Sequence, residues 1–228
     1  MFFRSQLNAQ RPTPNVQRPI LLSVEPIRLA LRASCRTFRI STMVAAQTRP
    51  FTAEDYRQLP PDDWRYQLIE GELVNMAPAP NLLHQTIVSN LIEIIAAYLS
   101  SHPIGRMYVA PTDVYLTDTN VFQPDVLFVG SARKSILKED GLHGAPDFLV
   151  EILSPHTARY DINAKREVYA RCGTEELWFV YPIANRIDVY LLQRDPGRPA
   201  HSHQAGAKFT SEIFPGLEFS VDEIFRAP

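Results

Sequence analysis

The sequence predicts one α/β domain in which helices flank a mixed central β-sheet. Three observations support this fold class. Predicted elements follow the order helix, strands, helix, strands, which is typical of layered α/β architectures. Two predicted strands, residues 125–129 and 148–153, are nearly continuous apolar runs, as expected for strands covered on both faces. No glycine-rich loop joins a strand to a helix, so the pattern supports neither a P-loop nor a dinucleotide-binding fold.

The size of the chain agrees with this expectation. Its 228 residues, 45% of them hydrophobic, are enough for one well-buried domain and too few for two large ones. The apolar runs are short, and the longest cluster, residues 87–99, is interrupted by polar side chains. We therefore expect no membrane-spanning segment and no membrane partner.

The first regular elements begin near residue 51. Residues 51–56 predict a short helix with Thr52 as N-cap and Asp55 at the capping-box position. The alternating pattern of residues 66–76, centred on Glu70-Gly71, predicts a β-hairpin. Apolar residues then recur every three or four positions, which predicts a helix over 82–100.

The later elements follow from the same kinds of pattern. Residues 157–172 predict a helix that ends at Gly173. The remaining expectations are strands at 107–116, 125–129 and 148–153, an antiparallel pair at 177–181 and 186–192, a loop at 194–206, a strand near 207–213 and a helix near 221–225.

Residues 1–50 differ in composition from the rest of the chain. They contain eight arginines, no lysine and one acid, Glu25, which is a balance of +7. Arg- and Ser-rich segments that are poor in acids are typical of transit peptides. The alternative is a disordered or spurious leader, because Met43 is an internal methionine just before the regular pattern begins. We favour the leader and expect the domain to comprise residues 51–228.

The predicted domain is acidic. Since the whole chain has a net charge of −2, residues 51–228 carry −9. A basic footprint is the usual mark of a dedicated DNA-coating protein, and it is missing here. The acidity counts less against a nuclease, because bound metal ions neutralise carboxylates and substrate phosphate alike.

Cysteine usage points to a reducing compartment. The two cysteines, Cys35 and Cys172, are too few for a disulfide framework or a structural zinc site. We therefore expect a cytoplasmic protein.

Two carboxylates occupy strand positions that are ordinarily apolar. Glu151 lies inside the run 148–153, where an ionised carboxylate is costly unless it is paired or bound to a cation. Asp125 opens the strand 125–129, and a lone acid at such a position is more often a solvated strand end or a cap. On neighbouring strands the two could converge on one hard cation, Mg²⁺ or Mn²⁺. We therefore expect a metal site formed by Asp125 and Glu151.

Two further residues are candidates for the same site. Lys165 follows Glu151 on the next predicted helix and could reach back to hold a phosphate oxygen or activate water. Alone, it would be an ordinary surface lysine. His84 opens the long helix, where a histidine can bind phosphate, ligate a metal or simply cap the helix.

From about residue 51 to 225, the sequence resembles the Uma-type family of restriction endonucleases in the PD-(D/E)XK superfamily. Several short strings match the family in order, and their order is far more specific than any one of them. They are Tyr66-Gln67-Leu68-Ile69-Glu70-Gly71-Glu72-Leu73, Ala77-Pro78 through His84, Pro124-Asp125-Val126, Gly144-Ala145-Pro146-Asp147, Val150-Glu151-Ile152-Leu153-Ser154-Pro155, and Asp161, Lys165, Tyr169, Gly173 and Trp178-Phe179-Val180.

The resemblance implies a restriction-endonuclease-like core in which acids from adjacent strands bind a divalent ion. On this basis Asp125 and Glu151 correspond to the metal ligands. The usual lysine of the superfamily lies two residues after the second acid, where this chain has Leu153. A helix lysine substitutes in the family, and Lys165 matches it. Gln67 stands where the family commonly has a glutamate.

The leading hypothesis is an Mg²⁺- or Mn²⁺-dependent endonuclease that hydrolyses phosphodiester bonds in DNA. Its catalytic residues would be Asp125, Glu151, Lys165 and His84. The displaced lysine, Gln67 and the acidic composition also allow a catalytically inactive nuclease fold that serves as a binding or assembly module. A hydrolase of another phosphate ester would use the same site. A homodimer is expected by analogy with the superfamily alone.

Overall fold

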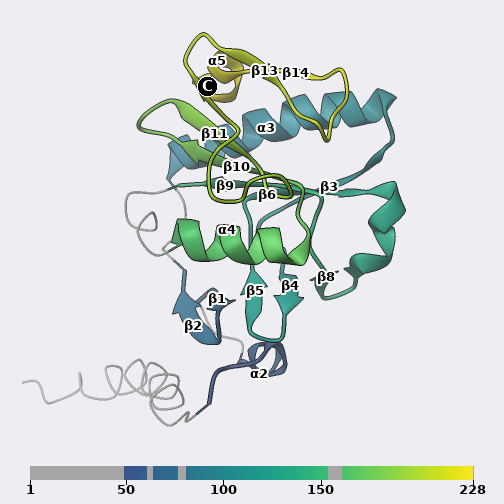
Figure 1. Cartoon of the computed structure of the whole chain (residues 1–228), viewed down its shortest axis with the longest axis vertical. Coiled ribbons are helices and arrows are strands. Elements are labelled where there is room, and N and C mark those ends of the chain that lie inside the picture. Colours follow the sequence, from purple (N-terminus) through teal and green to yellow (C-terminus); the bar gives the residue numbers. More distant parts are fainter. Residues whose placement is uncertain (1–48, 61–63, 77–80, 154–160, 228) are drawn as a thin grey trace, which may run out of the picture. The chain divides into compact units, whose positions relative to one another are not determined.

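The computed structural model describes residues 49–60, 64–76, 81–153 and 161–227, so the predicted leader lies almost wholly outside the described residues. At its centre is a six-stranded sheet in the order β12-β11-β10-β9-β6-β3 (Figure 1). Its strands are β3 (Gly105–Val109), β6 (Val126–Gly130), β9 (Phe148–Ile152), β10 (Glu176–Tyr181), β11 (Arg186–Leu191) and β12 (His201–Gln204). Only β9 and β10 pair in parallel, and the other neighbours are antiparallel. The predicted mixed sheet is therefore confirmed.

The parallel pair is joined by helix α4 (Asp161–Cys172). Parallel neighbours need such a crossover, because a tight turn can join only antiparallel strands. The helix ends at Gly173, whose φ is +96°. The Gly173 amide donates to the Ala170 carbonyl at 3.2 Å and the Thr174 amide to the Tyr169 carbonyl at 3.0 Å, which is the Schellman pattern. The predicted start of this helix at residue 157 lies outside the described residues.

Helices α3 (Leu82–Ser101) and α4 cover opposite faces of the central sheet (Figure 1). Alternate side chains of β6 supply the two cores: Val126 and Phe128 pack on the α3 side, and Leu127 and Val129 on the α4 side. This two-sided burial explains why the β6 and β9 sequences are continuously apolar. The same alternation decides which face Asp125 and Glu151 occupy.

Helix α3 is long and apolar enough to cross a membrane by length and composition alone. Core helices of globular domains also pass that test. Its Ile87, Leu91 and Ile95 side chains are fully buried in the core on one face of the sheet. The periodicity that predicted this helix therefore reflects packing against the sheet.

A second six-stranded sheet has the order β2-β1-β5-β4-β8-β7. Its strands are β1 (Tyr66–Ile69), β2 (Glu72–Asn75), β4 (Val114–Thr117), β5 (Asn120–Phe122), β7 (Leu137–Lys138) and β8 (Gly141–His143), and the 3₁₀ helix η1 (Ser131–Ile136) precedes β7. The predicted hairpin is confirmed as β1–β2. Phe122 of this sheet packs edge-on against Tyr169 of α4, with ring centroids 5.2 Å apart, so the second sheet supports the helix.

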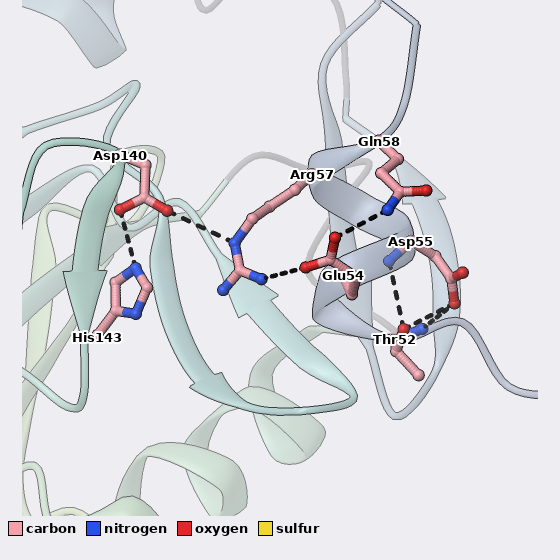
Figure 2. Close-up of polar contacts among 7 residues, drawn as sticks. All are labelled: Thr52, Glu54, Asp55, Arg57, Gln58, Asp140 and His143. Atoms are coloured by element: carbon pink, nitrogen blue, oxygen red, sulfur yellow. Dashed lines mark hydrogen bonds and ion pairs between the residues drawn. The ribbon is translucent and has the colours of Figure 1, made fainter.

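Helix α2 (Ala53–Arg57) is fixed to the second sheet by charged groups (Figure 2). The predicted capping box is present: Thr52 Oγ1 accepts from the Asp55 amide at 3.2 Å, and Asp55 Oδ2 accepts from the Thr52 amide at 2.8 Å. Arg57 lies 3.5 Å from Asp140, which in turn lies 2.9 Å from His143 of β8. These contacts anchor the start of the described domain.

One predicted strand is wrong. Residues 107–116 form two strands, because β3 ends at Val109 and β4 begins at Val114. Pro111 lies between them and has no amide proton for a strand ladder. The two strands belong to different sheets, so a single apolar pattern crosses from one sheet to the other.

The C-terminal part is also more regular than predicted. The expected loop 194–206 contains β12, the edge strand of the central sheet. The expected strand near 207–213 is confirmed as β13 (Lys208–Thr210), which pairs with β14 (Glu218–Ser220), and helix α5 (Val221–Ile224) follows. The unpredicted strands have two to four residues each, too few to show a period.

Candidate active site

Glu151 is buried in β9 and faces helix α4. Its side chain is paired with the ammonium of Lys165, whose Nζ lies 3.3 Å from Oε1 and 3.4 Å from Oε2. The Tyr169 hydroxyl donates to Oε1 at 2.9 Å. Glu151 is 8% exposed and Lys165 only 2%. The carboxylate that stood out in an apolar strand therefore has a cation and a hydroxyl donor, as a buried charge requires.

The helix geometry explains why these two side chains meet one carboxylate. Lys165 and Tyr169 are four residues apart, so they lie one above the other on the face of α4 that is turned to the sheet. The Lys165 ammonium also lies 5.7 Å from the centroid of the Phe122 ring, within the range of a cation–π contact. Lys165 is thus a core residue of the helix rather than a surface lysine.

Asp125 lies immediately before β6, and two groups orient its carboxylate. Oδ2 accepts a hydrogen bond from the Ile152 amide at 2.7 Å, and Oδ1 lies 3.2 Å from His84 Nε2. The Asp125 side chain is 19% exposed and that of His84 is 14% exposed. Asp125 is therefore a positioned group, and the alternative of a freely solvated strand end is wrong.

The strand register brings the two carboxylates to the same place. Val126 of β6 pairs with Val150 of β9, and continuing this register by one residue sets Asp125 opposite Glu151. Directly opposed residues of antiparallel strands point to the same face. The hydrogen bond from the Ile152 amide confirms that the Asp125 carboxylate lies against the residue next to Glu151. The structure thus joins all four predicted residues: His84 through Asp125, and Lys165 through Glu151.

His84 is held in the first turn of α3. Its amide donates to the side chain of Asn81, the N-cap, at 2.9 Å, so Asn81 caps the helix and leaves the imidazole for other contacts. With Nε2 facing Asp125, the other ring nitrogen, Nδ1, is buried without a hydrogen-bond partner. A buried ring nitrogen without a partner is costly unless a ligand or water supplies one.

The donor set fits a hard divalent cation. Asp125 and Glu151 offer carboxylate oxygens, and one carboxylate has about four acceptor positions on its two oxygens. In the described ranges no three His, Cys, Asp or Glu side chains gather into a ready-made metal cluster. Mg²⁺ is commonly held by one or two carboxylates, with waters and substrate phosphates as the remaining ligands. Two carboxylates at one strand end are therefore sufficient.

Another buried carboxylate in the same sheet shows what distinguishes Glu151. Glu176 begins β10, is 1% exposed, and accepts from Trp178 Nε1 at 2.6 Å and from the Glu212 amide at 3.0 Å. Burial raises the pKa of Glu176, and the hydrogen bonds from Trp178 and the Glu212 amide offset only part of that rise. Glu176 is held by neutral donors, whereas Glu151 is held by an ammonium and lies opposite a second carboxylate.

Two departures from the family pattern have clear structural positions. Leu153, where the superfamily usually has lysine, packs in the core on the α4 side and is 9% exposed. Gln67 of β1 is 5% exposed, and its Oε1 has no hydrogen-bond partner. Tyr169 was part of the matching pattern but had no predicted role, although its spacing of four from Lys165 could have suggested one.

Comparison with known families and structures agrees with the geometry. Residues 53–222 match the model of the Uma2 family, which is described as "Putative restriction endonuclease". The fold is similar to the crystal structure of a protein from Anabaena variabilis described as a putative nuclease belonging to DUF820, with a TM-score of 0.63. The two chains are 22% identical, and the match covers 77% of this chain and 98% of that one. The search of curated proteins gives no match.

The matched residues include the whole of the site just described, from His84 to Tyr169. They also span most of the described chain, including both helices that cover the central sheet. The chain belongs to the Uma2 family and has its restriction-endonuclease-like α/β fold.

Proposed function

We propose that the protein is a divalent-metal-dependent endonuclease that hydrolyses phosphodiester bonds in DNA. The observation that carries this proposal is the buried contact between Lys165 and Glu151, set opposite Asp125. Two acids and a lysine at one strand end are the groups that metal-assisted phosphodiester hydrolysis needs. The descriptions of the matched family and of the Anabaena protein support a nuclease as well.

Asp125 and Glu151 would hold Mg²⁺ or Mn²⁺. When bound, the ion polarises the scissile phosphate and lowers the pKa of a water molecule. Both residues would supply carboxylate oxygens as ligands. The ion would also relieve the repulsion between two acids that face each other on neighbouring strands.

Lys165, Tyr169 and His84 would contribute by holding charges and ligands in place. Lys165 places an ammonium beside the reacting phosphate, where it can orient the attacking water and stabilise the developing negative charge. Tyr169 restricts the rotation of the Glu151 carboxylate through its hydrogen bond. His84 fixes Asp125 through Nε2, while its Nδ1 is buried without a hydrogen-bond partner.

The test is plasmid nicking by the full chain with Mg²⁺, Mn²⁺ or EDTA, with single-stranded DNA and RNA as further substrates. We expect metal-dependent nicking by the wild type. Asp125→Asn and Glu151→Gln should each lower the rate by about 100-fold or more, because each removes a charged ligand at nearly constant shape. Unchanged cleavage by Glu151→Gln in Mg²⁺ would contradict the mechanism.

A matched control lies at the other end of the same strand. Asp147 precedes β9 and pairs with Arg133 at 3.0 Å, so Asp147→Asn removes a partly buried carboxylate away from the site. This variant should keep the wild-type cleavage rate.

Lys165→Ala would leave Glu151 buried without its cation, at a cost of about 3–5 kcal/mol, so Lys165→Arg is the better probe of the ammonium. We expect Lys165→Arg to fold and to lose most cleavage, because a planar guanidinium cannot occupy the same position.

The inactive-module alternative makes a different prediction for the same samples. A silent fold would cleave none of the three nucleic acids with any metal, and Mg²⁺ or Mn²⁺ would leave its melting temperature unchanged. Cleavage restricted to RNA would keep the metal mechanism and correct the substrate.

A further inference from the structure

Two arginines lie against tyrosine rings on the α4 side of the central sheet. Arg186, the first residue of β11, has its guanidinium carbon 4.0 Å from the centroid of the Tyr181 ring. Arg166 of α4 has its guanidinium carbon 5.3 Å from the centroid of the Tyr190 ring. The Arg186 side chain is 34% exposed, so its charge is fixed in place and still reachable from solvent. An arginine stacked in this way is ordered before any ligand arrives.

These arginines are neighbours of the candidate active site. Phe179 of β10 pairs with Glu151 of β9, and Tyr181 follows two residues later on the same face. Arg186 pairs with Tyr181 across β10 and β11. Arg166 directly follows Lys165 on α4. Both guanidinium groups therefore lie on the sheet face that carries Glu151. They stack on rings of the next two strands, Tyr181 of β10 and Tyr190 of β11.

Both groups have hydrogen-bonding capacity to spare. The Nε atoms of Arg166 and Arg186 are buried and have no hydrogen-bond partner. Arg186 Nε forms an ion pair with the buried Asp188 at 3.2 Å, and Asp188 also accepts from the Ser202 hydroxyl at 2.7 Å. Arg166 forms no ion pair with any residue in the described ranges. A buried donor without a partner is expensive unless a ligand fills it.

Other arginines of the domain differ from this pair. Arg171 on the same helix is 59% exposed and pairs with Glu70 at 2.9 Å, and Arg194 is 68% exposed and pairs with Glu212 at 2.8 Å. Their charges are already matched by exposed acids. Arg166 has no acidic partner in the described ranges, and Arg186 has only the buried Asp188, which also accepts from Ser202. In an acidic domain, these two cations beside the site are the natural contacts for a polyanion.

We propose that Arg166 and Arg186 form a binding site for the sugar-phosphate backbone of the substrate strand beside the Glu151–Lys165 pair. This inference rests on the proposed function, since it assigns the same nucleic acid as ligand. Arginine matches phosphate oxygens through paired N–H donors, and two guanidinium groups on separate elements suit the repeated charge of a backbone better than a single small anion. Their task is to position the strand; the chemistry belongs to the neighbouring carboxylates and lysine.

The test measures binding without cleavage. Fluorescence anisotropy of a labelled DNA duplex is followed with the full chain in EDTA over a series of salt concentrations, with single-stranded DNA and RNA as parallel arms. Arg166→Gln and Arg186→Gln should each weaken binding about three- to tenfold and lower the slope of log K against log salt by about 0.9 on duplex DNA. Arg171→Gln and Arg194→Gln remove the same charge from exposed, paired positions and should change neither quantity appreciably.

Removing Arg186 alone leaves Asp188 buried without its cation, so the double variant Arg186→Gln/Asp188→Asn tests the same contact in a neutral background. The inference is overturned if the two site arginines behave like the two control arginines, or if no nucleic acid binds. The outcome is independent of the nuclease proposal: binding that depends on Arg166 and Arg186 without any cleavage keeps this inference and rejects the enzyme.

Discussion

The Tyr169 hydroxyl holds one oxygen of the Glu151 carboxylate at 2.9 Å and is completely buried. Removing it leaves the ring and its packing against Phe122 in place. The carboxylate would keep Lys165 but lose one of the contacts that fix its rotation. The contribution of this hydroxyl is therefore orientation, which is separable from fold stability.

Under the proposed mechanism, Tyr169→Phe should lower plasmid cleavage about tenfold, because hydrogen-bond partners of metal ligands typically have effects of this size or larger. It should cost only about 1–2 kcal/mol in the free energy of unfolding. Tyr98→Phe is the control, since the Tyr98 hydroxyl donates to the Pro215 carbonyl at 2.9 Å on the far side of α3. Equal cleavage by both variants would show that the Tyr169 hydroxyl is purely structural.

Glu176 provides a test of buried charge that does not involve the active site. Its pKa is raised by burial, so the folded state binds a proton more tightly than the unfolded chain does. That stabilisation is complete below the unfolded-state pKa and is lost as the pH rises through the folded-state pKa. Glu176→Gln should therefore be more favourable relative to wild type at pH 7 than at pH 4. Urea unfolding at both pH values measures the difference, and a Glu176→Gln variant that is more favourable relative to wild type at pH 4 than at pH 7 would contradict the raised pKa.

At the scale of elements, the end of α4 is set by Gly173. Its φ of +96° is a conformation that side chains rarely adopt, and a Cβ there would meet no atom within 4 Å. Any cost of Gly173→Ala is therefore conformational and not steric.

We expect Gly173→Ala to destabilise the domain by about 1 kcal/mol, or roughly 2–4 °C in melting temperature. Gly130→Ala is the control, because Gly130 has a φ of −64° that alanine adopts freely. Thermal melts followed by circular dichroism compare the two. A larger loss from Gly130→Ala would reject the conformational argument.

The elements that could be predicted were those with enough residues to show a pattern. Helix α3, the β1–β2 hairpin and the β10–β11 pair follow from periodicity and turn residues. The division of residues 107–116 between two sheets could not, because an apolar run does not state which sheet each half joins. The strands β5, β7 and β8 have two or three residues each, and propensity over so few residues is too weak to reveal them.

At the scale of the whole molecule, the site assembles from four separate elements. Glu151 stands out from its apolar neighbours alone. Asp125 becomes a candidate only beside Glu151, and Lys165 depends on those two residues and on the family pattern. The contacts themselves, such as His84 with Asp125, come from the antiparallel register of β6 and β9 and from the crossover through α4. Register and crossover are tertiary properties, so the residues were predictable and their contacts were not.

Metal binding should appear as a property of the folded domain. If Asp125 and Glu151 hold the ion, saturating Mg²⁺ or Mn²⁺ should raise the melting temperature of the wild type, with about 2.7 kcal/mol of added stability at a concentration 100 times the dissociation constant. Asp125→Asn and Glu151→Gln should abolish that increase, and Asp147→Asn should keep it. Differential scanning fluorimetry with and without EDTA makes the comparison, and an increase that survives in both site variants would place the ion elsewhere.

Lys165 reaches Glu151 from a helix and not from the strand that carries the acid. If the acid and the lysine lay on the same strand, the central sheet would hold them together. Their contact would then be lost only when the whole domain unfolds. Here the ammonium can leave with its helix, since local opening of a single packed element costs less than global unfolding. Under the proposed mechanism, cleavage would then be lost at a lower temperature than the one at which the central sheet unfolds. The packing of one twelve-residue helix would set the upper temperature limit of activity.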